Sequence, residues 1–177
     1  MAKLKDAKVS YLSVAIISYD IEHLLILDIL LFWEFSMSDK SLLLMPLLGM
    51  IFLTFGIMVW ILKLRYRAVR EDGLNPRYFN LYRGGKLPDY LAKVTQHFEN
   101  LFEMPLFFYI GIILILVLDI VDSFYIFLAW VFFISRLIHT TIHTTYNKVA
   151  HRKNAFIIST LILIILWLKI TIDIIGL

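Results

Sequence analysis

The sequence contains no cysteine, and this absence narrows the chemistry that the chain can perform. Without cysteine there is no disulfide framework, no thiolate metal site and no protein thiol that acts as a nucleophile. Any thiol chemistry must therefore come from a ligand. Charged residues are also scarce, at 18% of 177 residues, whereas soluble domains contain about 25%.

The chain is rich in apolar residues. Hydrophobic residues make up 60% of the chain, and they occur in long runs. This composition predicts an all-α integral membrane protein in a lipid bilayer, with no room for a separate soluble domain. The net charge of +3 is too small to favour a nucleic-acid partner, so the placement of Lys and Arg is more informative than their number.

Four apolar stretches approach or exceed the roughly 20 residues that cross a bilayer. Polar segments separate them, which predicts a four-helix transmembrane domain over residues 41–177. The predicted spans are residues 41–62, 88–118, 124–146 and 154–174.

Residues 1–40 form a separate predicted segment. Three lysines precede an apolar stretch, 9–35, that is interrupted by acidic residues. This pattern suits an amphipathic helix lying in the membrane interface, and it equally suits an additional span that packs on the bundle. A cleaved signal peptide is disfavoured, because acidic residues interrupt the apolar core and no small-x-small site follows it.

Basic residues mark two of the connections between spans. Connections 63–95 and 148–153 carry most of the Lys and Arg, whereas connection 119–123 carries acidic residues and no basic ones. Because excess Lys and Arg lie on the cytoplasmic side, both basic connections are predicted to be cytoplasmic. The polar ends of the second, third and fourth spans should then lie at one membrane level.

The second span carries polar groups into its apolar run. Gln96, Asn100 and Glu103 share one helical stripe with Phe107. Because lipid cannot satisfy a carboxylate, Glu103 needs a partner from another helix and is a candidate for a functional site.

The third and fourth spans carry polar groups at the same predicted level. Arg136, His139, His143 and Asn147 share one face of the third span, and Arg152 begins the fourth. One interpretation is a ligand site. The alternatives are that Asn100 and Glu103 clamp the helices by pairing with Arg136 or His139, and that Arg152 only flanks a span.

These residues resemble the pattern of MAPEG proteins, the membrane-associated proteins in eicosanoid and glutathione metabolism, and specifically their uncharacterised bacterial branch. The resemblance covers residues 41–177, so the first 40 residues lie outside it. It rests on three motifs: Asn100-x-x-Glu103 followed by Pro105, Arg136-x-x-His139, and Thr145-Tyr146-Asn147-x-x-x-His151-Arg152.

The resemblance implies a four-helix bundle in a bacterial inner membrane, assembled as a homotrimer that binds glutathione between subunits near the cytoplasmic face. In family enzymes an arginine at the start of the fourth helix stabilises the glutathione thiolate, and Arg152 matches it best. The implied glutathione-binding residues are Asn100, Glu103, Arg136, His139, His143, Gln96 and Arg65, with Arg67 as an alternative to the last.

Three residues depart from the enzyme pattern. Gln96 stands where family enzymes commonly carry an arginine, His143 where they carry a tyrosine, and Phe156 where an aromatic hydroxyl is expected. The first departure removes a bidentate partner for a glutathione carboxylate.

Two functions follow. The first is a glutathione-dependent transferase or peroxidase that acts on an apolar small molecule or lipid from the cytoplasmic leaflet. The second is a non-catalytic scaffold that binds lipid or a partner between its subunits, which the three departures favour.

Two further patterns have ordinary explanations. His139 and His143 are four residues apart with His151 beyond, which is compatible with metal binding. Histidines near a membrane interface are more often hydrogen-bonded, and the family has no such metal, so we predict no metal site.

Tyrosines crowd the first basic connection, which is typical of an interfacial belt. A site for lipid headgroups is the alternative for Tyr66, Tyr78, Tyr82 and Tyr90.

Overall fold

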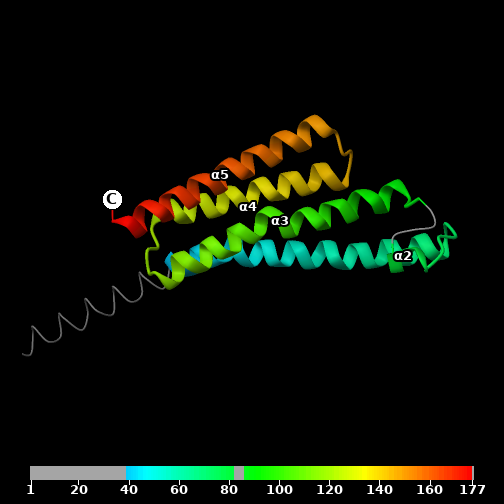
Figure 1. Ribbon diagram of the computed structural model, residues 1–177, viewed down its shortest axis with the longest axis horizontal. Coiled ribbons are helices and arrows are strands. Elements are labelled where there is room, and N and C mark those ends of the chain that lie inside the picture. The colour runs from blue at the N-terminus through cyan, green and yellow to red at the C-terminus, as the bar shows by residue number, and fades with distance from the viewer. Residues whose placement is uncertain (1–38, 82–85, 177) are drawn as a thin grey trace, which may run out of the picture. The chain divides into compact units, whose positions relative to one another are not determined.

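Four long helices form the bundle. The structure, a computed structural model, describes residues 39–81 and 86–176. Within these ranges four helices are long and apolar enough to cross a membrane, which confirms the all-α membrane bundle (Figure 1). They are Asp39–Arg70, α3 (Asp89–Val117), α4 (Ser123–Thr144) and α5 (Val149–Ile175), and a short helix, α2 (Tyr78–Leu81), precedes α3.

The predicted N-terminal helix lies outside the described residues, apart from its last two positions, Asp39 and Lys40. The bundle itself belongs to the compact unit 41–177.

Two helices extend beyond the predicted spans. The first continues to Arg70 rather than ending at residue 62, and α5 begins at Val149 rather than at residue 154. Lys and Arg favour helix, so a helix continues into water where hydropathy no longer detects it. Arg67 supports this extension by pairing with Glu71 one turn later, at 2.9 Å. The predicted basic connection 148–153 is therefore mostly the first turns of α5.

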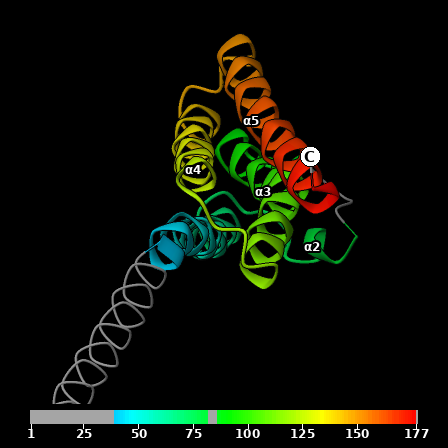
Figure 2. The same cartoon turned by 90° about the vertical axis from the view of Figure 1, so that its left-hand side faces the viewer.

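The helices α3, α4 and α5 contact one another, and all four helices are visible end-on in Figure 2. In the core, the buried rings of Phe108 from α3 and Phe132 from α4 stack with centroids 4.4 Å apart. The first helix approaches α4 at Gly49, where a Cβ atom would lie 2.7 Å from the Phe133 ring. Glycine thus lets these two helices pack closely.

Adding one methyl group at Gly49 is expected to destabilise the bundle. Gly49→Ala forces the Phe133 ring to move and should cost about 1–3 kcal/mol in the free energy of unfolding. Gly56→Ala is the matched control, because Gly56 lies in the same helix and a Cβ atom added there would meet nothing within 4 Å. Equilibrium unfolding in mixed micelles measures both, and equal stabilities would contradict the close approach.

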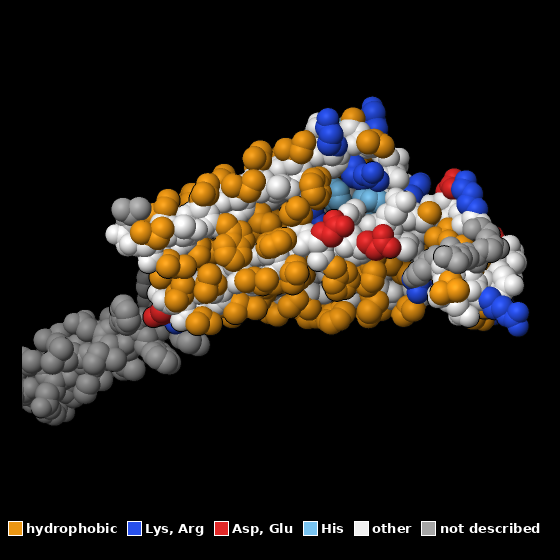
Figure 3. Space-filling view, viewed as in Figure 1, with side chains coloured by type: hydrophobic (Ala, Val, Ile, Leu, Met, Phe, Trp, Pro, Cys, Tyr) orange, Lys and Arg blue, Asp and Glu red, His pale blue; other side chains and the backbone are white. Residues whose placement is uncertain are grey.

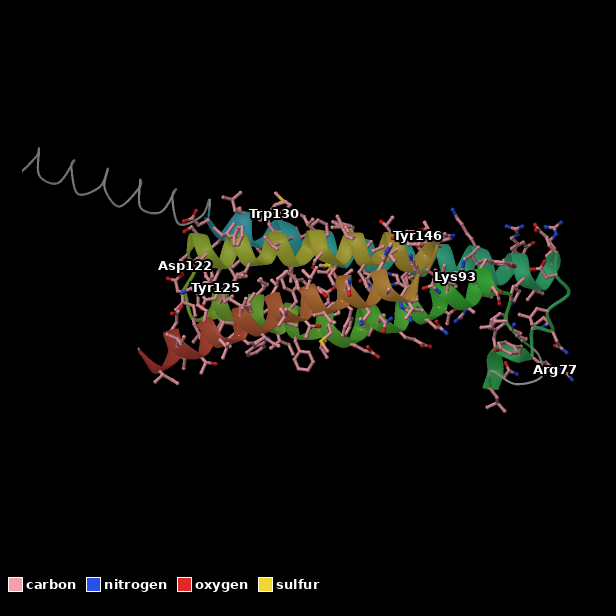
Figure 4. The ribbon with its side chains drawn as sticks, turned by 90° about the horizontal axis from the view of Figure 1, so that it is seen from above. Arg77, Lys93, Asp122, Tyr125, Trp130 and Tyr146 are labelled. Atoms are coloured by element: carbon pink, nitrogen blue, oxygen red, sulfur yellow. The ribbon has the colours of Figure 1, made fainter. Side chains whose placement is uncertain are left out.

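A polar clamp closes the bundle end at the α3–α4 connection, where Figure 4 labels Asp122 and Tyr125. Lys169 of α5 pairs with Asp122 at 2.8 Å and with Asp173 at 2.9 Å. Tyr125 donates to Asp173 at 2.7 Å, and its ring lies under the Lys169 ammonium at 4.5 Å. One ammonium therefore joins α5 to the residue that caps α4.

Lys169→Met is expected to lower the thermal unfolding midpoint, because it leaves two carboxylates side by side without their shared cation. Lys86→Met is the control, since the Lys86–Asp89 pair is exposed and 3.7 Å apart. The clamp is refuted if both variants unfold at the same temperature.

Candidate functional site

Polar side chains from three helices gather toward the end of the bundle where α4 connects to α5. On this face, histidine, acidic and basic side chains lie together beside an otherwise apolar surface (Figure 3). Lys93 of α3 donates to the Thr145 carbonyl at the end of α4, at 3.2 Å. Figure 4 labels Lys93 and Tyr146 at this end, opposite the polar clamp. The ends of α3 and α4 therefore meet here, as the sequence predicts.

Arg152 is held by residues of the preceding helix and turn. Its Nη1 donates to Asn147 Oδ1 at 3.0 Å and lies 3.3 Å from His143 Nε2. Because a guanidinium only donates, His143 accepts this contact through Nε2 and carries its ring hydrogen on Nδ1. Asn147 has a positive φ of 49°, so the residue that turns the chain between α4 and α5 also anchors Arg152.

Arg136 lies at the centre of the bundle and is fully buried. It donates from Nη2 to the Asn100 carbonyl at 3.1 Å and from Nη1 to Ser159 Oγ at 3.5 Å, which links α4 to α3 and α5. Its Nε is buried without a hydrogen-bond partner among the described residues. The cation thus reaches no carboxylate within ion-pair distance in the described part of the chain.

Three imidazoles form a cluster, defined here as His97, His139 and His143, with ring centroids 5.1–5.6 Å apart. Thr140 donates to the Arg136 carbonyl at 2.8 Å, so His97 Nε2 must donate to Thr140 Oγ1 at 2.9 Å. All three rings are buried, and each Nδ1 lacks a partner among the described residues. A group of imidazoles at membrane depth is a functional-site feature.

A polar pocket of about 310 Å³ opens beside Arg152. Its volume is at the lower end of the range for small-molecule sites, about 300–1,000 Å³. It is lined by Asn100, His139, Val149, Arg152, Lys153 and Phe156. The pocket therefore combines two cationic side chains, an amide and a buried imidazole from three helices.

An apolar groove of about 400 Å³ lies between α3 and α5, further along the bundle. It is lined by Met104, Phe107, Thr160, Leu163, Ile164, Trp167, Leu168 and Thr171. Its α5 residues follow those of the polar pocket at helical spacing. A polar pocket and an apolar groove thus succeed each other along one helix pair.

The predicted site residues divide into two groups. Asn100, Arg136, His139, His143 and Arg152 come together as described above.

The remaining three predicted residues lie apart from this contact network. Glu103 and Gln96 are exposed on α3 and do not line the pocket, although Glu103 interacts electrostatically with Arg136. Arg65 lies instead under α2, with its guanidinium 5.1 Å from the centre of the Phe79 ring. Within residues 39–81 and 86–176, no three His, Cys, Asp or Glu side chains, the imidazole cluster included, are arranged so that they could hold a metal ion.

Sequence reasoning missed three polar residues: His97, Thr140 and Ser159, all of which are buried. One signal was available for the first. His97 falls on the stripe of α3 that otherwise holds buried apolar residues such as Val94 and Leu101, where a polar side chain is unexpected.

The chain matches a known protein family. The model of the MAPEG family matches residues 43–172, a range that includes every residue of the polar pocket and of the imidazole cluster. No curated protein and no solved structure matches the chain.

Proposed function

This chain belongs to the MAPEG family, and on that premise we propose that it is a membrane-bound, glutathione-dependent transferase or peroxidase. The family includes glutathione transferases alongside other proteins. The observation that supports an enzyme here is Arg152, which is held by Asn147 and His143 at the wall of the polar pocket.

The residues present suit a thiol ligand. A thiol is mostly protonated at neutral pH, and a neighbouring cation favours the thiolate. Arg152 and Lys153 supply that positive charge, and His139, whose Nδ1 has no hydrogen-bond partner among the described residues, lines the same pocket. When bound, glutathione would supply the sulfur that attacks an electrophile.

The chain's own residues would position the ligand and stabilise its negative charge. Asn147 and His143 contact the Arg152 guanidinium, and Arg136 donates to the Asn100 carbonyl. Because the Arg152 guanidinium is already in place, the protein needs little rearrangement when negative charge develops on the reacting sulfur.

The apolar groove supports a hydrophobic second substrate. Its lining includes Met104, Phe107 and Trp167, and it follows the polar pocket along α3 and α5. An apolar electrophile or lipid peroxide dissolved in the bilayer would reach the pocket through this groove without crossing water.

We also propose a homotrimer whose polar end faces the cytoplasm of a bacterial inner membrane. Basic residues flank the polar end in the connection before α3 and again at the start of α5, which is typical of the cytoplasmic side. Glu99 and Glu103 are exposed on α3, and a neighbouring subunit would shield them from lipid.

Adding glutathione to the detergent-purified protein tests the enzyme proposal. We expect a thiolate difference absorbance in the ultraviolet and a higher thermal unfolding midpoint, because a ligand stabilises the folded state that binds it. Absence of both signals would refute glutathione binding.

A non-catalytic scaffold is the second candidate. Phe156 lines the polar pocket where family enzymes are expected to carry an aromatic hydroxyl, and His143 replaces a tyrosine. This function predicts lipid or partner binding between subunits without a thiolate signal.

A further inference from the structure

A second apolar groove, of about 290 Å³, lies between α4 and α5 and is called here the α4–α5 groove. Its α4 wall consists of Ser135, Ile138 and Ile142, and its α5 wall includes His151, Asn154 and Ile158. These α5 residues recur every three or four positions, so they form one stripe of the helix. None of the residues that line the groove lines the polar pocket, so the two are separate features of the same pair of helices.

The α4–α5 groove begins near one membrane surface and continues into the hydrocarbon. Lys169 of the polar clamp lies toward the far end of α5, and His151 precedes it by about 27 Å of helix. Because a hydrocarbon layer is about 30 Å thick, His151 lies at one surface when the Lys169 ammonium reaches the other. Ile158 lies about 10 Å further into the layer than His151. The groove thus has its polar end at the level of lipid headgroups and its apolar end at the level of acyl chains.

The polar end of the groove carries groups that can bind a phosphate. His151 Nδ1 lies 3.2 Å from the hydroxyl of Tyr146, which Figure 4 labels at this end, so Nε2 of the same ring remains for a ligand. Lys148 precedes His151 by three residues, so the two exposed side chains lie on the same side of α5. Asn154, one turn after His151, adds an amide that can donate.

The α4–α5 hairpin contains no carboxylate that could neutralise this end of the groove. Between Asp122 and Asp173 the sequence holds no acidic residue, whereas three basic residues occur at the start of α5 or directly before it. The ion pairs within residues 39–81 and 86–176 do not include Lys148. The charge at the polar end therefore complements an anionic group from outside the hairpin.

We propose that the α4–α5 groove binds an anionic phospholipid, with one acyl chain between the two helices and the phosphate at Lys148 and His151. Basic residues beside a membrane surface attract anionic lipids, and a groove that continues into the hydrocarbon holds the chain of the same molecule. A phospholipid without net charge offers the chain but lacks this attraction. The inference is independent of the proposed function, because the groove and the polar pocket share no residue.

The test compares two phospholipids with identical dioleoyl chains, phosphatidylglycerol and phosphatidylcholine, added to the detergent-purified protein. Native mass spectrometry counts the lipids bound per subunit at each lipid concentration. We expect phosphatidylglycerol to bind about fivefold more tightly, which is the effect of one basic residue near a membrane surface. Equal binding of the two lipids would refute the selection of an anionic headgroup.

Lys148→Gln tests the headgroup contact, and Lys86→Gln is the matched control. Lys86 is also an exposed lysine beside a span, but it precedes α3 and does not line the groove. We expect Lys148→Gln to reduce the preference for phosphatidylglycerol to about twofold or less and Lys86→Gln to leave it near fivefold. An equal reduction in both variants would show that net charge, and not this site, selects the lipid.

Ile158→Trp tests the acyl-chain contact, and Ile157→Trp is the matched control. Both isoleucines are exposed and adjacent on α5, but only Ile158 lines the groove, which a larger side chain there would fill. We expect Ile158→Trp to weaken binding of both lipids by about tenfold, the effect of displacing about two methylene groups of the chain. Ile157→Trp should leave lipid binding unchanged.

Two results would assign the groove differently, and either one overturns the inference. If Ile158→Trp lowers the oligomeric mass and leaves lipid binding unchanged, the groove receives a second copy of this chain. If both tryptophan variants bind lipid as the wild type does and keep its mass, the lipid binds elsewhere on the bundle. The comparison of the two lipids on the wild-type protein stands even if a variant folds poorly.

Discussion

Arg152→Gln is expected to abolish the thiolate signal and to lower turnover by about 100- to 1,000-fold, the loss seen when one preorganised donor to a developing negative charge is removed. Glutamine keeps a donor at the pocket wall but carries no charge. The measurement is the ultraviolet difference spectrum on adding a thiol, together with kcat/KM for a model electrophile.

Lys153→Gln is the matched control for this substitution. Lys153 is the next residue of α5 and lines the same pocket, but it is exposed and lacks the contacts with Asn147 and His143 that hold Arg152. We expect a loss of less than about tenfold, because a mobile surface charge acts mainly through a screened field. Equal losses in the two variants would show that net positive charge matters and that the geometry of Arg152 does not.

Arg136→Ala is expected to lower the free energy of unfolding by about 3 kcal/mol or more. Arg136 is the largest fully buried side chain in the described residues, so truncation opens a cavity where three helices meet. It also removes the hydrogen bonds to the Asn100 carbonyl and to Ser159.

Arg136→Met separates packing from charge. Methionine fills much of the same volume without a cation, and replacing a buried charge with an apolar side chain is often neutral or stabilising, so we expect a change of about 1 kcal/mol or less. Unfolding in mixed micelles measures both variants. If Arg136→Met is as unstable as Arg136→Ala, then the hydrogen bonds of the guanidinium, and not its volume, hold the helices.

Hydropathy was sufficient to predict the four helices, because a run of apolar residues is the direct requirement of the bilayer. It located α3 to within one residue at each end, at Asp89 and Val117. Hydropathy did not predict the helix ends that consist of basic residues. The first helix continues to Arg70 and α5 begins at Val149, although the low hydropathy of these segments indicates loops.

The candidate site was predictable in part for a similar reason. Topology places polar residues of adjacent helices at one depth, so the meeting of Asn100, His143 and Arg152 follows from their positions in the spans. Rotation about each helix axis does not follow from depth. Glu103 shares a stripe with Asn100 in the sequence, yet it is exposed, while His97 turns inward to Thr140.

The turn between α4 and α5 limits which residues can replace Asn147. Asn147 adopts a left-handed backbone conformation, which asparagine tolerates better than most residues, and the same side chain accepts from Arg152. Glycine would preserve the bend and release the guanidinium, whereas aspartate would hold the guanidinium but neutralise it. One residue therefore sets both the bend of this hairpin and the position of its cation, so a substitution at Asn147 is expected to change at least one of them.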